Sequence, residues 1–239
     1  MVRKRGPTCE AFASKPAKAK VLREIPMVRT TREKVVDSFM TLYLLRDAFY
    51  RKRVGRVEAT RLQKLVFLSE LPMIQQRKKG FNFGFVRLNY GPYSSDLASE
   101  ETRLAKAGLI FSSSREPTRT AATILDQFSE IVARNDDFFR IVRATNDNWA
   151  RMNLRLLLRT VHSMPWGRGT VHDLAPGTVM LYRMNPQQAA SNFDITDEEI
   201  DDLWMNFDPS MVADYAQAMK EVRSGQLRTH EQLLATLRA

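Results

Sequence analysis

The stretch LNYGPYSSDL, residues 88–97, is the sequence feature that most restricts how this chain folds. It follows FNFGFVR, in which large apolar residues alternate with small or polar ones, as is typical of a β-strand. Gly91 tolerates backbone angles that other residues avoid, and Pro92 disfavours the helical conformation at Gly91. Ser94 or Ser95 then offers a hydroxyl oxygen to the free N–H groups of a new helix. The stretch therefore predicts a strand that ends in a corner and leads directly into a helix.

The predicted helix after this corner ends at Gly108, a residue type suited to the left-handed turn that terminates many helices. Asp96 lies near the positive end of this helix, and Leu97 belongs to its buried face. We interpret the rings of Tyr90 and Tyr93 as filling the space between strand and helix, because turn chemistry accounts for every residue of the corner. Direct contact with a ligand is the less favoured alternative.

Apolar residues at helical spacing predict that most of the chain is helical. One helix is expected from a cap at Thr30 or Thr31 up to the basic stop YRKR at residues 50–53, and a second begins near Glu58. Further helices are expected over residues 121–134, 136–145 and 147–162, with breaks at Asn135 and Asn146. The predicted fold class is α+β and mostly helical: a compact helical domain with a small antiparallel sheet and a C-terminal helical tail.

Charge is distributed unevenly along the 239 residues, which carry a net charge of +10. Residues 1–34 hold ten Lys and Arg against three acids, whereas residues 184–219 hold eight acids and no Lys or Arg. The first 30 residues also lack sustained hydrophobic periodicity. These shifts predict three parts: a basic flexible arm over residues 1–30, a domain over residues 31–183, and an acidic linker with a helical tail over residues 184–239.

Several classes of protein are disfavoured by what the sequence lacks. There is no run of 18 apolar residues and no apolar stretch after the first basic residues, so we expect a cytoplasmic protein that neither spans a membrane nor is secreted. Cys9 is the only cysteine, which excludes a disulfide within the chain. His162, His172 and His230 lack metal-ligand spacing, and no nucleophile motif accompanies them. We therefore expect no metal, no cofactor and no enzymatic activity.

Four pieces of the sequence, in this order and spacing, resemble the SocA/YwgA-like family, which includes the Panacea antitoxin domain. They are TRLQKLVFL (60–68), the aromatic strand, NYGPYSSDL (89–97) and LAKAGLI (104–110). The residues that carry the resemblance are Leu62, Lys64, Tyr90, Gly91, Pro92, Tyr93, Ser94, Asp96 and Leu97. The resemblance covers about residues 32–165. It implies a mostly helical domain with a small sheet, found in phage-associated proteins and in antitoxins whose variable extensions neutralise toxins.

The last part of the chain, residues 207–239, is similar to the C-terminal half of type II antitoxins, in which an acidic, Ala-rich helix, a Gly and a capped final helix recur. Met211, Tyr215 and Met219 form an apolar stripe at i, i+4 and i+8. Such a stripe has to be covered. The sequence leaves open whether the chain's own domain or a second polypeptide covers it.

An acidic segment with aromatic anchors suits a basic groove on a partner, because buried anchors give affinity and charge speeds the encounter. We therefore predict an antitoxin that binds a cognate toxin, small and basic, through this tail. The predicted toxin-binding residues combine apolar anchors with carboxylates: Ile200, Leu203, Trp204, Phe207, Met211, Tyr215, Met219, Asp197, Glu198 and Asp201.

A DNA-binding regulator of its own operon is the alternative from another class. The polar hairpin at residues 111–120 would act as the wing of a winged-helix-like element, or a homodimer would bring two basic arms to operator DNA. The residues that would contact phosphates are Arg3, Lys4, Arg5, Arg115 and Arg119. A third alternative, an adaptor that delivers a bound partner to a protease, is permitted by the family resemblance alone.

Overall fold

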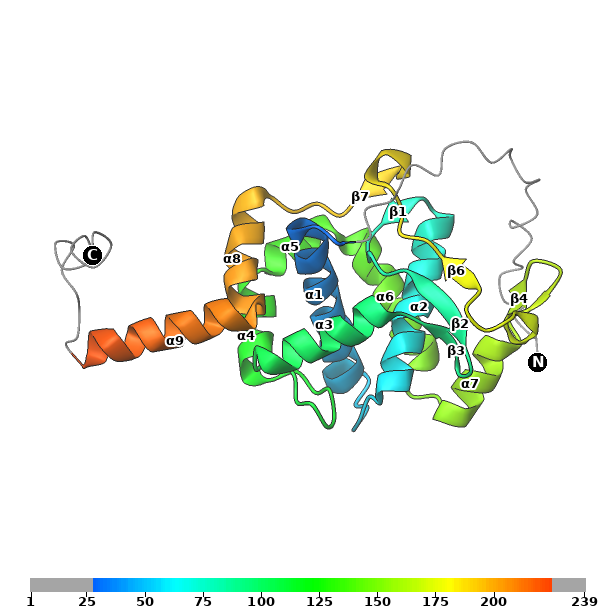
Figure 1. Ribbon diagram of the computed structural model, residues 1–239, viewed down its shortest axis with the longest axis horizontal. Coiled ribbons are helices and arrows are strands. Elements are labelled where there is room, and N and C mark those ends of the chain that lie inside the picture. The colour runs from blue at the N-terminus through cyan, green and yellow to red at the C-terminus, as the bar shows by residue number, and fades with distance from the viewer. Residues whose placement is uncertain (1–27, 225–239) are drawn as a thin grey trace, which may run out of the picture.

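The computed structural model describes residues 28–224. Helices dominate this part of the chain, and short strands lie along one side of them (Figure 1). The α-helices are α1 (Thr31–Arg46), α2 (Ala59–Gln75), α3 (Ser95–Lys106), α4 (Arg119–Gln127), α5 (Ser129–Arg134), α6 (Asp136–Trp149), α7 (Leu154–His162), α8 (Asp197–Phe207) and α9 (Pro209–Arg223). A π-helical turn, η2 (Asp47–Arg51), continues α1. The fold is mostly helical α+β, as the sequence predicts.

The strands form three small groups. An antiparallel sheet has the order β3-β2-β6, β4 and β5 form an antiparallel hairpin, and β1 pairs with β7 in parallel. The strands are β1 (Lys78–Lys79), β2 (Phe85–Leu88), β3 (Gly91–Tyr93), β4 (Pro165–Trp166), β5 (Gly169–Thr170), β6 (Val179–Leu181) and β7 (Ser191–Asn192). The parallel pair joins two segments more than a hundred residues apart in the sequence.

Helix α1 lies in the middle of the described body and is buried over almost its whole length. Helices α3, α4, α6 and α8 all contact it. Its buried residues include Asp37, Ser38 and Thr41 as well as apolar side chains. Because a buried polar group is unfavourable unless it is hydrogen-bonded, the surrounding elements have to supply partners for this helix.

A buried ionic network supplies several of these partners. Arg29 donates to Asp37 Oδ2 at 2.7 Å and to Glu100 Oε2 at 3.3 Å, which ties α1 to α3. The backbone N–H of Asn82 donates to the other oxygen of Asp37 at 2.7 Å. Arg29 is thus buried in the body. The prediction of a flexible arm that runs to residue 30 is wrong at this end, because an ion pair fixes Arg29.

Two predicted helix caps are confirmed. Thr30 caps α1 through a capping box with Glu33. At the corner, Gly91 has a φ of +87°, and the hydroxyl of Ser94 accepts a hydrogen bond from the N–H of Leu97 at 3.3 Å. The chain passes from β3 to α3 with one intervening residue, so the predicted start of a helix after the corner is confirmed. The corner itself differs from the prediction, because Gly91–Tyr93 form a second strand that pairs with β2 in a hairpin.

The two asparagines expected to break helices behave differently. Asn135 separates α5 from α6, in agreement with the prediction. Asn146 lies inside α6, which continues to Trp149, so the break predicted there is wrong. Its buried amide donates to Leu44 O at 2.9 Å and to Asp47 Oδ2 at 2.8 Å. Asn146 is therefore a partner for the end of α1 and not a helix stop.

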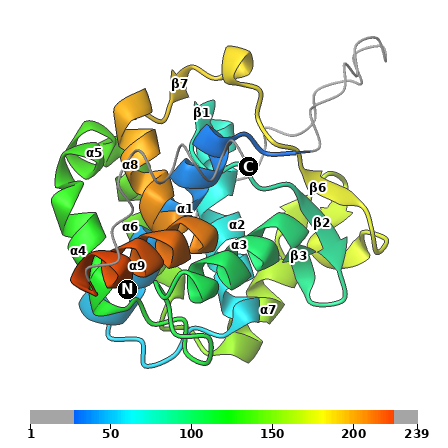
Figure 2. The same ribbon diagram turned by 60° about the vertical axis from the view of Figure 1, so that its left-hand side comes forward.

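Residues 184–207 belong to the same body as the rest. The N–H of Phe193 donates to Lys79 O at 3.1 Å beside the β1–β7 pair, and Phe193 and Ile195 are buried. Helix α8 then lies against α1. The domain boundary predicted at residue 183 is wrong, because the packing changes only after Phe207. From there α9 leaves the body (Figures 1 and 2).

Every helix within residues 28–224 is too short or too polar to span a bilayer.

Candidate functional site

Helix α8 carries four of the predicted toxin-binding anchors, and three of them are in the core. A capping box of Thr196 and Glu199 begins the helix, and its Ile200, Leu203 and Phe207 are buried. Their spacing of three and four residues puts them on one helix face, which α1 covers. The prediction that these three side chains wait for a second protein is therefore wrong.

Trp204 is half-buried on the edge of the same helix. Two cations lie over its ring: the Arg103 guanidinium carbon is 5.1 Å from the ring centroid, and the Lys34 ammonium is 5.9 Å away. Arg103 also donates to the carbonyl of Phe207 at 3.1 Å, which fixes the last turn of α8. Trp204 therefore helps to hold α8 on the body, and only part of its ring remains accessible.

The carboxylates of α8 lie on the outer face of the helix. Asp197 forms an exposed ion pair with Arg32 at 3.3 Å. Glu198, Asp201 and Asp202 are exposed and form no ion pair with any residue in the described range. This face therefore presents uncompensated negative charge to solvent.

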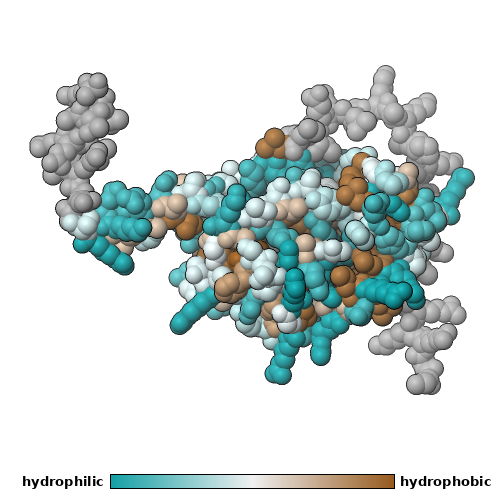
Figure 3. Space-filling model, turned by 60° about the horizontal axis from the view of Figure 1, so that its bottom comes forward, coloured by the Kyte–Doolittle hydropathy of each residue, from teal (hydrophilic) through white to brown (hydrophobic). Residues whose placement is uncertain are grey.

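Helix α9 begins at a capping aspartate, Asp208, and then projects from the body (Figure 1). None of its residues is buried. Tyr215 is 63% exposed and Val222 is 49% exposed, and Met211 and Met219 are partly exposed. Figure 3 shows hydrophobic residues among the polar ones along this projecting helix. The apolar stripe predicted from the sequence is thus present and uncovered among the described residues.

Side chains of α2 hold the corner in place through hydrogen bonds to its backbone. The Lys64 ammonium donates to Pro92 O at 2.6 Å. Gln63 bonds both backbone groups of Ser94, accepting from its N–H at 2.8 Å and donating to its carbonyl at 3.0 Å. Tyr90, in contrast, is 68% exposed, so the prediction that its ring fills the space between strand and helix is wrong.

The other residues of the motif have structural positions. Leu62 and Leu97 are in the hydrophobic core, and the carbonyl of Asp96 accepts from buried Arg29 at 3.4 Å. Tyr93 is half-buried. Beside these residues the corner borders a groove of about 430 Å³ between α2, the β2–β3 hairpin and α3.

The residues proposed for DNA contact are not brought together. Arg115 turns inward, forming an ion pair with Glu101 at 2.6 Å and donating to Val57 O at 3.3 Å. Its hairpin has a single bridge, between Ile110 and Pro117, instead of the strand pair of a wing. Arg119 is exposed at the start of α4. The prediction that Arg115 contacts DNA is wrong, because the carboxylate of Glu101 compensates its charge. Arg3, Lys4 and Arg5 lie outside the described residues.

A different basic surface surrounds α7, and it was not predicted from the sequence. Arg151, Arg155, Arg159 and Arg168 are exposed, and none forms an ion pair with the residues that the structure describes. The signal was present in the sequence, because no Asp or Glu occurs between Asp147 and Asp173. Arg155 and Arg159 are one helical turn apart, so both lie on one side of α7.

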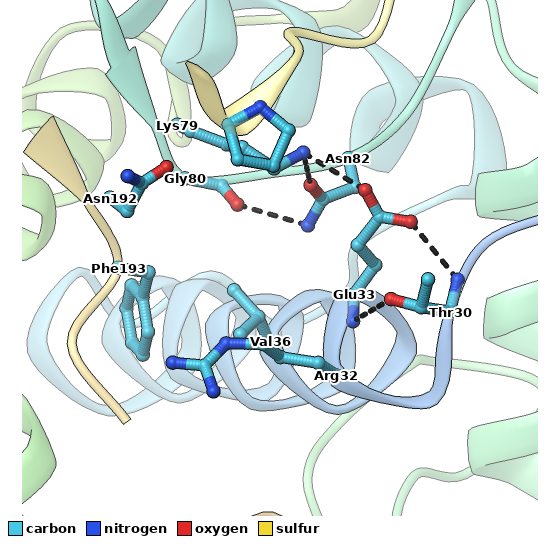
Figure 4. A pocket seen from close by; sticks show the side chains of 10 residues that line it. Thr30, Arg32, Glu33, Val36, Lys79, Gly80, Asn82, Asn192 and Phe193 are labelled. Atoms are coloured by element: carbon cyan, nitrogen blue, oxygen red, sulfur yellow. Dashed lines mark hydrogen bonds and ion pairs between the residues drawn. The ribbon is translucent and has the colours of Figure 1, made fainter. Parts of the chain in front are cut away.

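A second hollow, of about 330 Å³, lies between α1 and the segment around β7 (Figure 4). Lys79 lines it and donates to Glu33 Oε1 at 2.9 Å, Asn82 Oδ1 at 2.5 Å and Met184 O at 2.8 Å. These three acceptors satisfy the three donors of the ammonium group. Lys79 therefore acts as a clasp between the body and the chain that leads to α8.

Two carboxyl groups behind this hollow are buried. Burial raises the pKa of Asp37 to about 7, although Arg29 opposes the shift. Burial also raises the pKa of Glu70 well above its ordinary value, and the nearby charge of Asp37 adds to the effect. Glu70 Oε2 has no hydrogen-bond partner within the described chain. Burial therefore favours the neutral, protonated form of the Glu70 side chain.

The structure brings two histidines together that are ten residues apart in the sequence. The Nδ1 atoms of His162 and His172 are 3.4 Å from each other. Within residues 28–224, however, no cluster of three His, Cys, Asp or Glu side chains has the arrangement of a metal site. The pair lies beside the corner, where a Cβ at Gly91 would come within 3.3 Å of His162 Nε2.

Comparisons with known proteins do not assign the chain to a family. No family model, no curated protein and no solved structure matches it. Its function therefore has to be argued from the surfaces described above.

Proposed function

We propose that this protein is a cytoplasmic antitoxin that neutralises a small, basic protein toxin by direct contact through α9. The observation behind this proposal is that α9 projects from the body with Tyr215 and Val222 exposed, Met211 and Met219 partly exposed, and no residue buried. The resemblance of the α2 and corner segments to the SocA/Panacea antitoxin domain supports it, because that family carries its toxin-binding function on variable extensions.

The energetics of α9 favour a partner. An isolated helix of this length, 15 residues, is only marginally stable in water, and most helices in proteins owe their stability to packing of an apolar face. Helix α9 contacts α8 and the edge of α3 at its base, and none of its residues is buried. A protein that covers the stripe would therefore stabilise the helix and gain apolar contact at the same time.

The charge near α9 indicates the chemistry of that partner. Residues 184–219 contain eight acids and no Lys or Arg, and Glu198, Asp201 and Asp202 have no ion-pair partner among the described residues. A basic surface would be attracted to this face, and such attraction raises the association rate. A toxin that binds nucleic acid through a basic face has the required charge.

The structure changes the set of residues proposed to touch the toxin. Ile200, Leu203 and Phe207 are removed because they are core residues, and Trp204 is retained only through its accessible edge. The revised contact set is Trp204, Met211, Tyr215, Met219, Val222, Asp197, Glu198 and Asp201.

A growth assay with the product of the adjacent reading frame tests the proposal. A chain that ends at Phe207 keeps every buried residue of the described core, so it should fold but fail to protect cells from that product. Tyr215→Ala combined with Met219→Ala should weaken protection in the full chain. Tyr182→Ala, which changes an equally exposed tyrosine on the body, is the matched control. Full protection by the folded, truncated chain would refute the proposal.

The exposed arginines around α7 favour a second candidate, a regulator that binds operator DNA. Phosphate contacts release counterions, so affinity should fall steeply as salt rises. An electrophoretic shift on the upstream promoter at two salt concentrations tests this, with Arg155→Glu and Arg159→Glu as variants. The absence of a shift at low salt would remove the candidate.

A further inference from the structure

The groove at the corner differs in character from the helix proposed to bind a toxin. It is enclosed by the first turns of α2, by the β2–β3 hairpin and by the middle of α3, and its volume is about 430 Å³. In Figure 1 this hairpin lies on the opposite side of the body from α9. The groove is therefore a separate surface, which the antitoxin proposal does not use.

Lys64 is the unusual residue of this groove. Its side chain is only 2% exposed, and Pro92 O, at 2.6 Å, is the single acceptor for its ammonium group among the described residues. No described carboxylate is within 4.0 Å of it. Lys79 is also buried, yet it has three acceptors. Lys64 thus has two unused donors and no counter-ion in a place where a charge is poorly solvated.

The surroundings of Lys64 add positive potential. Ala59 and Thr60, in the first turn of α2, line the same groove, and Glu58 at the N-cap makes no side-chain cap bond. The positive end of the helix is therefore directed at this region. Glu101 is the only carboxylate among the lining residues, and its ion pair with Arg115 at 2.6 Å compensates its charge.

The opposite wall of the groove is apolar and accessible. Leu88 is 40% exposed and Tyr90 is 68% exposed, and Tyr93 continues this wall toward α3. Exposed aromatic and aliphatic side chains that gather beside a hollow mark ligand-binding surfaces more often than isolated ones do. The groove therefore combines one buried cation with a hydrophobic wall.

We propose that this groove binds a carboxylate ligand with an aromatic or aliphatic body, whose carboxylate accepts from Lys64 Nζ while the body lies against Leu88 and Tyr90. A carboxylate fits better than a phosphate, because a single ammonium group matches one negative charge, whereas phosphate sites commonly use Arg or several donors. Such a carboxylate exists in free carboxylic acids and at the C-terminus of a polypeptide.

Titration of the full-length, ¹⁵N-labelled chain by NMR tests this site. The probes are 3-phenylpropionate and its neutral amide, and the peptide Ala-Ala-Phe with a free or an amidated C-terminus. We expect the carboxylate forms to shift the backbone amides of Gly91 and Ser94, and to bind at least tenfold more tightly than the neutral forms. Preference for the free acid or for the peptide shows which source of carboxylate the groove takes.

Three variants make the assignment specific. Lys64→Met should weaken binding of the preferred carboxylate at least tenfold, since it keeps the length of the side chain and removes its charge. Tyr90→Ala should weaken binding severalfold, and Tyr182→Ala should leave it unchanged. Equal binding by wild type and Lys64→Met, or equal binding of the charged and neutral probes, would overturn the proposal. A chain that ends at Phe207 should bind the carboxylate as tightly as the full chain does. This result would test the groove independently of the proposed toxin binding by α9.

Discussion

Arg103 lies against the ring of Trp204, with its guanidinium carbon 5.1 Å from the ring centroid, and the same guanidinium donates to buried Glu100 at 2.6 Å. One side chain of α3 therefore joins the ionic network around α1 to the acidic helix α8. Through this contact, the helix that begins at the corner also positions the segment from which α9 projects.

Replacing Arg103 should release the end of α8. We expect Arg103→Met to reduce the free energy of unfolding by about 2 kcal/mol, because a hydrogen bond to a charged, buried group is lost. Urea unfolding monitored by tryptophan fluorescence measures this loss, and Trp204 should become more accessible to a quencher. Arg140→Met is the control, because Arg140 is paired only with exposed Asp136. An equal effect of the two substitutions would contradict the role given to Arg103.

The correction of the α8 anchors makes a prediction of its own. Leu203→Ala should destabilise the protein by about 3 kcal/mol, since it leaves a cavity against α1. Tyr215→Ala on α9 should change stability by less than about 0.5 kcal/mol, because exposed positions contribute little. Chemical denaturation of both variants distinguishes a core helix from an exposed one. A small loss for Leu203→Ala would restore the interpretation of α8 as an uncovered binding helix.

Stability should fall as pH rises through the weakly acidic range. The folded pKa of Glu70 is raised above its ordinary value of 4.5, so above that pH the folded chain holds a proton that the unfolded chain has released. Glu70→Gln has no such proton and should lose less stability between about pH 5 and pH 7. The pKa of Asp37 is about 7, so Asp37 still contributes part of the pH dependence of stability in this variant.

Free energies of unfolding from urea titrations at several pH values measure the Glu70 effect. Glu198→Gln, at an exposed position of α8, is the control and should keep the native pH dependence. Parallel curves for Glu70→Gln and the native chain would show that Glu70 does not titrate differently in the folded state.

Lys64 should make the stability of the protein rise with pH in the alkaline range, which is opposite to the effect of Glu70. Burial lowers its pKa to about 8 from an ordinary value of 10.5, so the unfolded chain binds more protons between these values and stability rises with pH there. Lys64→Met should abolish this rise and should exceed the native stability near neutral pH, where the native chain has to bury an ammonium group. Thermal unfolding across this pH window checks both statements, with exposed Lys106→Met as the control. A rise that persists in Lys64→Met would assign it to another group.

Local chemistry explains which parts of the fold could be predicted. The helix start after the corner and the caps at Thr30 and Ser94 depend on residues within a few positions of each other, and the structure confirms them. The alternation of Phe81, Phe83 and Phe85 predicts a strand, but only residues 85–88 form one. All three rings are buried, and so is Asn82 between them. An alternating sequence therefore does not show whether a neighbouring strand is present.

The incorrect predictions share a different physical origin. The apolar stripe of α8 shows that something covers it, but the sequence does not state that α1 does. Asn146 ends no helix because Leu44 and Asp47, a hundred residues earlier, accept both hydrogen bonds from its amide nitrogen. Arg115 is likewise neutralised by a residue on another helix. In each case a distant partner decides the outcome, and composition or spacing along the chain does not identify that partner.

The direction of α9 keeps the proposed toxin-binding helix apart from the groove beside Lys64. Its 15 residues form a helix about 22 Å long, which contacts α8 and α3 at its base and points away from the β2–β3 hairpin. The groove beside Lys64 lies on the other side of the body, so a protein bound to α9 alone does not occupy it. Helix α3 lines this groove and contacts the base of α9, and it is therefore a direct physical connection between the two surfaces.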